Sequence, residues 1–211
     1  MTLKLYYSPG ACSLASHIAL CEAGADVELH LVKFTDNEQR SAEHLELNPL
    51  GRVPVLVTDR GTLTENPAIL AWVARTCPQA RLAPLDDPWA MAEVESFNSF
   101  VASSVHVAFS HLFRPGRWVD PEPAQKATAA KAPEIIRSMF DIVETKLASG
   151  PFVHGERFTT SDAYLCVMSR WLFRTGVGDA ARFPRTRAHA ALVQARPATL
   201  AALAAEGLTA I

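Results

Sequence analysis

The sequence lacks the features that mark secreted, membrane-spanning and nucleic-acid-binding proteins. No apolar run approaches the roughly 18 residues of a membrane-spanning helix, and no basic stretch followed by an apolar core opens the chain. The 20 basic and 22 acidic side chains nearly cancel, so the charge balance favours neither nucleic acid nor an anionic membrane as a partner. We therefore expect a cytoplasmic protein that binds neither.

Cysteine is scarce, and its four copies at positions 12, 21, 77 and 166 are far apart. They form no Cys-x-x-Cys pair and no Cys/His cluster, whereas zinc sites and disulfide frameworks depend on such spacing. The sequence thus predicts a protein of a reducing compartment with no metal site. Apolar residues make up 49% of the chain, which is enough for the core of one large or two small domains.

What the sequence does contain begins with a strand-to-helix junction. Residues 3–7 form an apolar and aromatic run typical of a buried strand, and a Ser-Pro-Gly turn ends it. From Ser13 to Gly24 the apolar residues recur at helical spacing. Cys12 and Ser13 should therefore lie at a helix N-terminus, which favours a thiolate or a bound anion. Because this effect amounts to roughly 0.3–2 kcal/mol, we expect the Cys12 pKa to fall from about 8.5 to about 7.5.

The segments that follow predict a small mixed sheet. Residues 27–32 alternate with period two, and the intervening helix indicates a parallel βαβ unit. Residues 53–57 and 62–64 predict an antiparallel hairpin. A helix should follow, with Asn66 as its N-cap and Pro67 at its first position. This order predicts a four-stranded mixed sheet with helices on it.

The second half of the chain predicts helices alone. A proline-containing linker at 81–87 separates residues 1–80 from a helical domain at 88–211. Its first helix should cover residues 89–112. Thr159-x-x-Asp162 resembles a capping box, so we assign Asp162 to capping the almost wholly apolar helix at 163–173, which should be central.

This order of motifs resembles that of the cytosolic glutathione transferases. The matching segments are Asn48-Pro49-x-Gly51-x-Val53-Pro54, Leu63-Thr64-Glu65-Asn66-Pro67-Ala68-Ile69 and Phe158-Thr159-x-x-Asp162. Two further segments are similar to the bacterial beta class: Lys4-Leu5-Tyr6-Tyr7-x-Pro9-Gly10-Ala11-Cys12-Ser13-Leu14, and Val105-His106 after Phe100-Val101-Ala102-Ser103. Together the motifs run nearly from end to end of the chain.

The resemblance implies a thioredoxin-like α/β N-terminal domain, an all-α C-terminal domain with the hydrophobic substrate pocket, and a homodimer. It implies glutathione as co-substrate, no permanently bound cofactor and a cis peptide bond before Pro54. The resemblance implies three groups of site residues. The catalytic residues are Cys12, Ser13 and His106. The residues that bind glutathione are Val53, Pro54, Glu65, Asn66, Ser103 and Ser104, and the residues that bind a small apolar electrophile are Ala11, Phe109 and Phe113.

Two of these assignments also have a physical basis in the residues. Pro54 leaves a strand edge free, so the Val53 backbone can pair with the extended cysteinyl part of glutathione. Glu65, beside the exposed N–H groups of a helix start, suits the γ-glutamyl end, which carries an ammonium and a carboxylate. Ser104 departs from the beta class, where an acidic residue is usual, and this predicts a weakened contact to glutathione across the dimer.

Three functions follow from this reading. The first is conjugation of glutathione to an apolar electrophile, with the helix N-terminus, Ser13 and Cys12 stabilising the glutathione thiolate. The second is thiol–disulfide reduction through a mixed disulfide on Cys12; Ala15 leaves no Cys-x-x-Cys partner, so the cycle would be monothiol. The third is a non-enzymatic carrier of glutathione or apolar ligands.

Overall fold

The computed structural model describes residues 3–211, and its N-terminal part is built on a four-stranded mixed sheet. The strands are β1 (Leu3–Tyr7), β2 (Val27–Leu31), β3 (Val55–Thr58) and β4 (Gly61–Thr64), in the order β2-β1-β3-β4. β1 and β2 are parallel, and the other two pairs are antiparallel. The predicted sheet is confirmed, except that β3 begins at Val55 rather than at residue 53.

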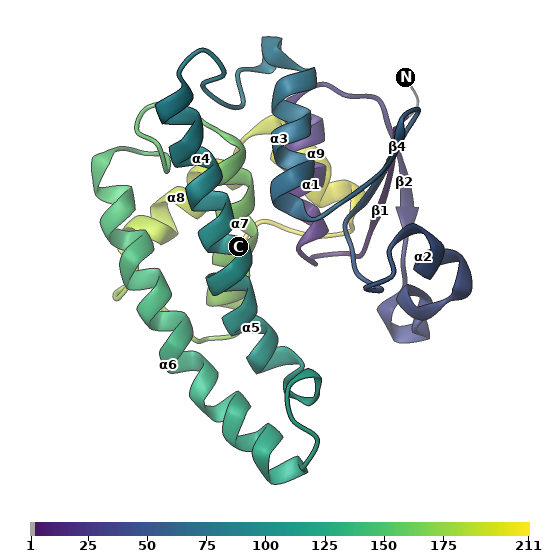
Figure 1. Ribbon diagram of the computed structural model, residues 1–211. Coiled ribbons are helices and arrows are strands. Elements are labelled where there is room, and N and C mark those ends of the chain that lie inside the picture. Colours follow the sequence, from purple (N-terminus) through teal and green to yellow (C-terminus); the bar gives the residue numbers. More distant parts are fainter. Residues whose placement is uncertain (1–2) are drawn as a thin grey trace.

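Helices cover both faces of this sheet because the strand side chains alternate between them. Leu3, Leu5 and Tyr7 of β1 join the core with α1 (Ser13–Glu22) and α3 (Asn66–Thr76). Tyr6 points to the opposite face, where it belongs to a second cluster that includes Leu47 of α2 (Ala42–Leu47). Figure 1 shows α1 and α3 between the sheet and the helical part, with α2 on the outer side.

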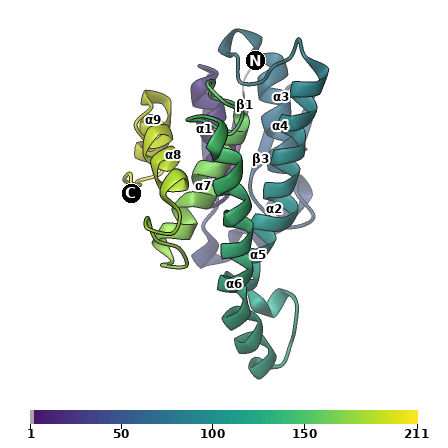
Figure 2. The same ribbon diagram turned by 90° about the vertical axis from the view of Figure 1, so that its left-hand side faces the viewer.

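The remaining chain is helical. Its helices are α4 (Pro88–Phe100), α5 (His106–Phe113), α6 (Glu122–Lys146), α7 (Thr160–Arg174), α8 (Pro184–Gln194) and α9 (Pro197–Ala205). Short 3-10 turns cover Phe34–Asp36, Glu38–Arg40, Pro78–Ala80, Pro115–Arg117 and Leu147–Ser149. α5 and α6 extend together beyond the rest of the molecule (Figure 2). The helix predicted at 89–112 is interrupted by a π-helical turn, Val101–Val105, which joins α4 to α5.

The central position predicted for the apolar helix is confirmed. Every residue of α7 from Thr160 to Arg170 is buried, and the capping box is present, with Thr159 N donating to Asp162 Oδ2 at 2.7 Å. Asp162 Oδ1 accepts from Val153 N and contacts His189 Nε2 at 2.9 Å. These contacts use both oxygens of Asp162, which agrees with its assignment to capping.

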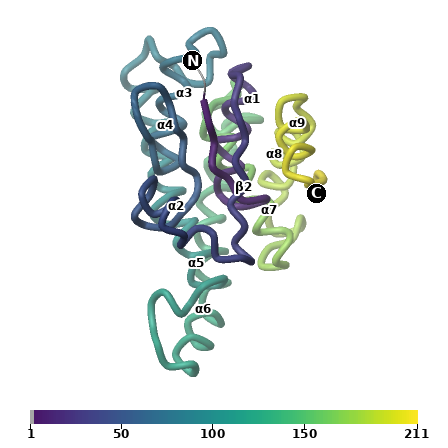
Figure 3. The backbone as a smooth tube through the Cα atoms, turned by 90° about the vertical axis from the view of Figure 1, so that its right-hand side faces the viewer, coloured from purple at the N-terminus to yellow at the C-terminus, as the bar shows by residue number. Residues whose placement is uncertain are grey.

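The two ends of the chain meet beside the sheet. α1 packs against α7 and α9, and Figure 3 shows α1 and α9 side by side although they are far apart in sequence. His17 Nδ1 lies 2.9 Å from Glu206 Oε1 inside this contact, and Arg196 forms two hydrogen bonds with Glu22. One apolar core therefore runs through both parts. Within residues 3–211, no helix combines the length and apolarity needed to cross a membrane.

Candidate functional site

The site is centred on Cys12, which is the N-cap of α1 as predicted. Its side chain is only 9% exposed, and its thiol donates to the Val53 carbonyl (Sγ···O 3.2 Å). Burial, followed by the charge of Glu65, raises the pKa of Cys12 to about 12; the backbone, Arg52 and Arg114 lower it by less. The expected fall of this pKa is therefore wrong, because desolvation outweighs the helix N-terminus.

Ser13 lies beside Cys12 at the start of α1. Its hydroxyl is fully buried, accepts from the backbone N–H of Ser8 at 3.2 Å and donates to the Ser8 carbonyl at 3.3 Å. Both bonds close the turn between β1 and α1 and hold the Cys12 loop in shape. The assignment of Ser13 to the glutathione thiolate stays a prediction.

The α3 junction also differs from the sequence prediction. Glu65, not Asn66, is the N-cap of α3, and its φ of 68° is a conformation that a residue with a side chain rarely adopts. Such strained residues cluster at functional sites. The buried Asn66 side chain accepts from Ser16 Oγ at 2.7 Å and donates to the Cys12 carbonyl at 2.9 Å. Asn66 thus fixes the start of α1, while the Glu65 side chain stays exposed.

The Val53–Pro54 peptide bond is cis, as the resemblance implied. Val53 is buried and precedes β3, and the contacts within residues 3–211 include none for its backbone N–H. Its carbonyl contacts only the Cys12 thiol. A backbone N–H without a partner among the described residues is a group with which an added extended peptide would pair.

His106 lies at the start of α5, directly after the π-helical turn. Its ring packs edge-on against Trp171, with centroids 5.3 Å apart, and its Nδ1 lies 3.5 Å from the Tyr164 hydroxyl. Burial, with Arg52 and Arg117 adding to it, lowers the pKa of His106 to about 4. The imidazole is therefore neutral at pH 7, with one ring N–H to donate.

Ser103 and Ser104 lie in the π-helical turn, one helical turn before His106. Within the described residues neither hydroxyl bonds to another predicted site residue. Ser103 is exposed and Ser104 half-buried. Their assignment to glutathione stays a prediction.

The apolar wall differs from the predicted one. Phe109 is fully buried between Phe140, Trp171 and Phe113, so it belongs to the core and cannot line a pocket. Phe113, also predicted for this wall, is stacked on Phe109 and is 48% exposed. Trp171 packs edge-on against Phe113 with centroids 5.6 Å apart. Ala11 is half-buried in the loop on the other side of the site.

Sequence reasoning missed two residues of α7 at this site. Trp171 donates its indole N–H to the Gly10 carbonyl at 2.9 Å and so ties the Cys12 loop to the helical part. Burial, followed by the charge of Cys12, raises the pKa of Tyr164, which therefore remains protonated beside His106. The available signal was that a tryptophan and a tyrosine inside an apolar helix need partners for their polar ends.

Comparison with protein-family models identifies the family to which this chain belongs. The model "Glutathione S-transferase, N-terminal domain" matches residues 1–75, and "Glutathione S-transferase, C-terminal domain" matches residues 102–197. Glutathione S-transferase GstA of Escherichia coli is 35% identical over 98% of this chain and 100% of its own length. The chain belongs to the glutathione S-transferase family.

Solved structures of this family superpose closely on the chain. A glutathione transferase homologue from Sulfitobacter with bound glutathione has a TM-score of 0.92 at 36% identity and covers 99% of both chains. The bacterial beta class glutathione S-transferase of Sphingomonas chungbukensis has a TM-score of 0.84 at 38% identity, with 98% of this chain and all of that one covered. The predicted family, the two-part fold and the assignment as a glutathione transferase enzyme are confirmed.

Proposed function

We propose that this glutathione transferase joins reduced glutathione to an apolar aromatic electrophile at the Cys12–Val53 junction. The observation that carries the proposal is the backbone N–H of Val53, which has no partner within residues 3–211, next to the buried Cys12 thiol. A cysteinyl residue paired with that backbone would place its sulfur beside the start of α1. The γ-glutamyl end would then reach Glu65 and the N-terminus of α3.

The nucleophile in this mechanism is the glutathione thiolate, not Cys12. The Cys12 thiol stays protonated at neutral pH, and its S–H would turn from the Val53 carbonyl to donate to the anionic glutathione sulfur without repelling it. Neutral His106 offers one further N–H, and the positive charges of Arg52 and Arg114 favour the thiolate over the thiol. The proton of glutathione leaves to solvent as the sulfur ionises.

The electrophile would bind against Phe113, Trp171 and Ala11, where the aromatic side chains offer apolar area. The sulfur attacks the electrophilic carbon, a C–S bond forms, and the leaving group departs with its electron pair. The protein contributes the positions of the two substrates and the stabilisation of one anion.

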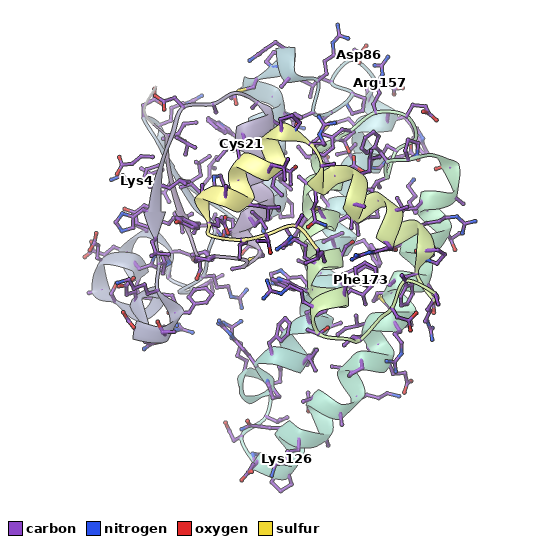
Figure 4. The ribbon with its side chains drawn as sticks, turned by 180° about the vertical axis from the view of Figure 1, so that it is seen from behind. Lys4, Cys21, Asp86, Lys126, Arg157 and Phe173 are labelled. Carbon is purple, nitrogen blue, oxygen red and sulfur yellow. The ribbon has the colours of Figure 1, made fainter. Side chains whose placement is uncertain are left out.

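The second candidate, disulfide reduction through Cys12, requires the Cys12 thiolate to attack a sulfur. The raised pKa of Cys12 leaves little thiolate at neutral pH, which favours conjugation over this route. Cys21, the nearest cysteine along the chain, lies at the other end of α1, where Figure 4 shows it beside α9. Cys21 is therefore not placed to resolve a disulfide on Cys12, and the reductase route would remain a monothiol cycle.

Conjugation of an aryl halide and glutathione-dependent reduction of a mixed disulfide, measured for wild type and Cys12→Ala, test the proposal. Conjugation should fall by no more than about tenfold, the worth of one charge-assisted hydrogen bond, and any reduction should disappear. Cys21→Ala is the matched control and should change neither. Loss of conjugation by several orders of magnitude in Cys12→Ala, or a wild type that only reduces disulfides, would contradict the proposal.

We further propose that the enzyme is a homodimer that uses the outer face of α4. Trp89 is 77% exposed and Ile142 of α6 is 52% exposed, and both line a hollow of about 440 Å³. Phe97 and Phe100 form its floor, and Glu93 and Lys146 stand at its edge. Apolar side chains gathered in this way on a surface favour association. Ser103 and Ser104 lie in the π-helical turn that directly follows α4 and leads to His106.

A further inference from the structure

Four arginines from three separate segments act electrostatically on the site residues or on one another. Arg40 ends the turn Glu38–Arg40, Arg52 precedes Val53, and Arg114 and Arg117 follow α5. Within residues 3–211, none of the four lies within ion-pair distance of a carboxylate, and none of their guanidinium groups has a hydrogen-bond partner, unlike Arg75, Arg182 and Arg196.

Arg52, Arg114 and Arg117 lie in turns with defined contacts. Arg114 and Arg117 flank a single 3-10 turn, in which the Arg117 N–H donates to the Arg114 carbonyl at 3.1 Å. The Arg114 guanidinium lies over the Phe34 ring, 4.9 Å from its centroid, and thus reaches from the helical part to the sheet domain. On that side, the Arg52 carbonyl accepts from Asn48 Nδ2 at 3.0 Å and lies 3.0 Å from His44 Nε2.

The four charges act on one another and on the reactive groups. Burial lowers the pKa of Arg117, and the charges of Arg114, Arg52 and Arg40 lower it further. Arg52 also acts on both Cys12 and His106. Like charges gathered beside a site favour the binding of a ligand that supplies the opposite charge.

Glutathione itself accounts for only part of this charge. With its cysteinyl residue at Val53 and its γ-glutamyl end at Glu65, its glycyl carboxylate would extend toward Arg52 and Arg40 in the sheet domain. Arg114 and Arg117 belong to the helical part and directly follow Phe113 of the apolar wall. An anion held by this second pair would therefore belong to the other substrate.

We propose that the second substrate is an aromatic electrophile with a carboxylate or sulfonate, held by Arg114 and Arg117 while its ring lies on Phe113 and Trp171. This inference rests on the transferase function proposed above and narrows its substrate class. Guanidinium groups bind such oxyanions through paired N–H donors. With an aryl chloride, the glutathione sulfur forms a C–S bond, the C–Cl bond breaks, and chloride leaves with the bonding pair.

The test compares 4-chloro-3,5-dinitrobenzoate with its uncharged methyl ester, each rate being divided by that of the uncatalysed reaction with glutathione. In the double variant Arg114→Gln/Arg117→Gln, kcat/KM for the benzoate should fall about 10- to 100-fold, the worth of one or two charge-assisted hydrogen bonds. The ester loses no ionic contact, so its rate should fall only by the contribution that Arg114 makes to the glutathione thiolate, which is several-fold less than the fall for the benzoate. The KM for glutathione should stay the same.

A matched control removes the same two charges elsewhere. Arg60 lies in the β3–β4 turn and Arg157 in a surface loop, which Figure 4 shows close to Asp86 and far from the end of the molecule marked by Lys126. Arg60→Gln/Arg157→Gln should leave the benzoate preference intact. An equal fall for benzoate and ester, no benzoate preference in the wild type, or a rise only in the KM for glutathione would overturn the inference.

Failure of the proposed transferase function can be distinguished from failure of the proposed anion site. If the wild type conjugates neither compound, the transferase proposal fails, and calorimetric binding of unreactive 3,5-dinitrobenzoate then decides the anion site. Binding that weakens at least about tenfold in Arg114→Gln/Arg117→Gln supports the site. Absence of binding, or equal binding to both proteins, overturns it.

Discussion

At the scale of single residues, burial decides the chemistry of this site more than position along the chain does. Cys12 stands at a helix N-terminus, yet desolvation raises its pKa to about 12. His106, also desolvated, has its pKa lowered to about 4. Both side chains are therefore neutral hydrogen-bond donors at physiological pH. A site with two neutral donors is suited to stabilising an anion that a substrate brings, rather than an ionised side chain of the protein.

The state of His106 gives a prediction about pH. Its pKa lies below the ordinary 6.5, so the unfolded chain binds this proton first and the free energy of unfolding should fall as pH drops from about 6.5 toward about 4. Its NMR resonances should stay constant from pH 8 to about 5.5. His106→Asn should lose this part of the pH dependence. A titration midpoint near 6.5 in the folded enzyme would contradict the assignment.

At the scale of elements, the start of α1 is shaped by segments distant in sequence. Asn66 of α3 binds the Cys12 carbonyl, Trp171 of α7 binds the Gly10 carbonyl, and Glu206 after α9 accepts from the Gly10 N–H at 2.9 Å. The turn between β1 and α1 thus has fixed partners on three sides. This arrangement explains how a short loop can hold a reactive centre in one geometry.

The exposed face of α4 carries a prediction about assembly. If that face covers a second copy, Trp89→Glu places a charge in an apolar contact and should convert the dimer to a monomer. Light scattering at micromolar concentration measures this directly. Leu200→Glu, on the exposed side of α9, is the control and should leave the mass unchanged. A monomeric wild type would remove the dimer from the proposed function.

At the scale of the whole molecule, one buried ionic contact joins the first helix to the end of the chain. His17 and Glu206 are both almost inaccessible, and their Nδ1 and Oε1 atoms are 2.9 Å apart. Burial alone would lower the pKa of His17, but Cys21 and Glu206 outweigh it and raise that pKa to about 9. The pair therefore holds an imidazolium at neutral pH.

This contact predicts a loss of stability at alkaline pH. A raised pKa gives a stabilisation that is complete below the unfolded value of 6.5 and lost as pH rises through about 9. Urea unfolding should show wild type exceeding His17→Gln by on the order of 3 kcal/mol at pH 6 and by much less at pH 9.5. Glu206→Gln should show the same flattening. A constant difference across this range would rule out an ion pair.

The sequence by itself determined the order of elements, the mixed sheet, the central capped helix and the family. These features follow from periodicity, turn residues and local motifs, which act over a few neighbouring residues. Cys12 at the start of α1 and the Val53–Pro54 loop could be placed for the same reason.

Only the tertiary structure decided which side chains are free to react. Phe109 has the right chemistry and spacing, but Phe140 and Trp171 of other helices cover it. Trp171 and Arg114 reach the site from helices whose position depends on the packing of the whole core. Burial and the pKa values that depend on it are sums over residues distant in the chain, and local sequence patterns do not contain them.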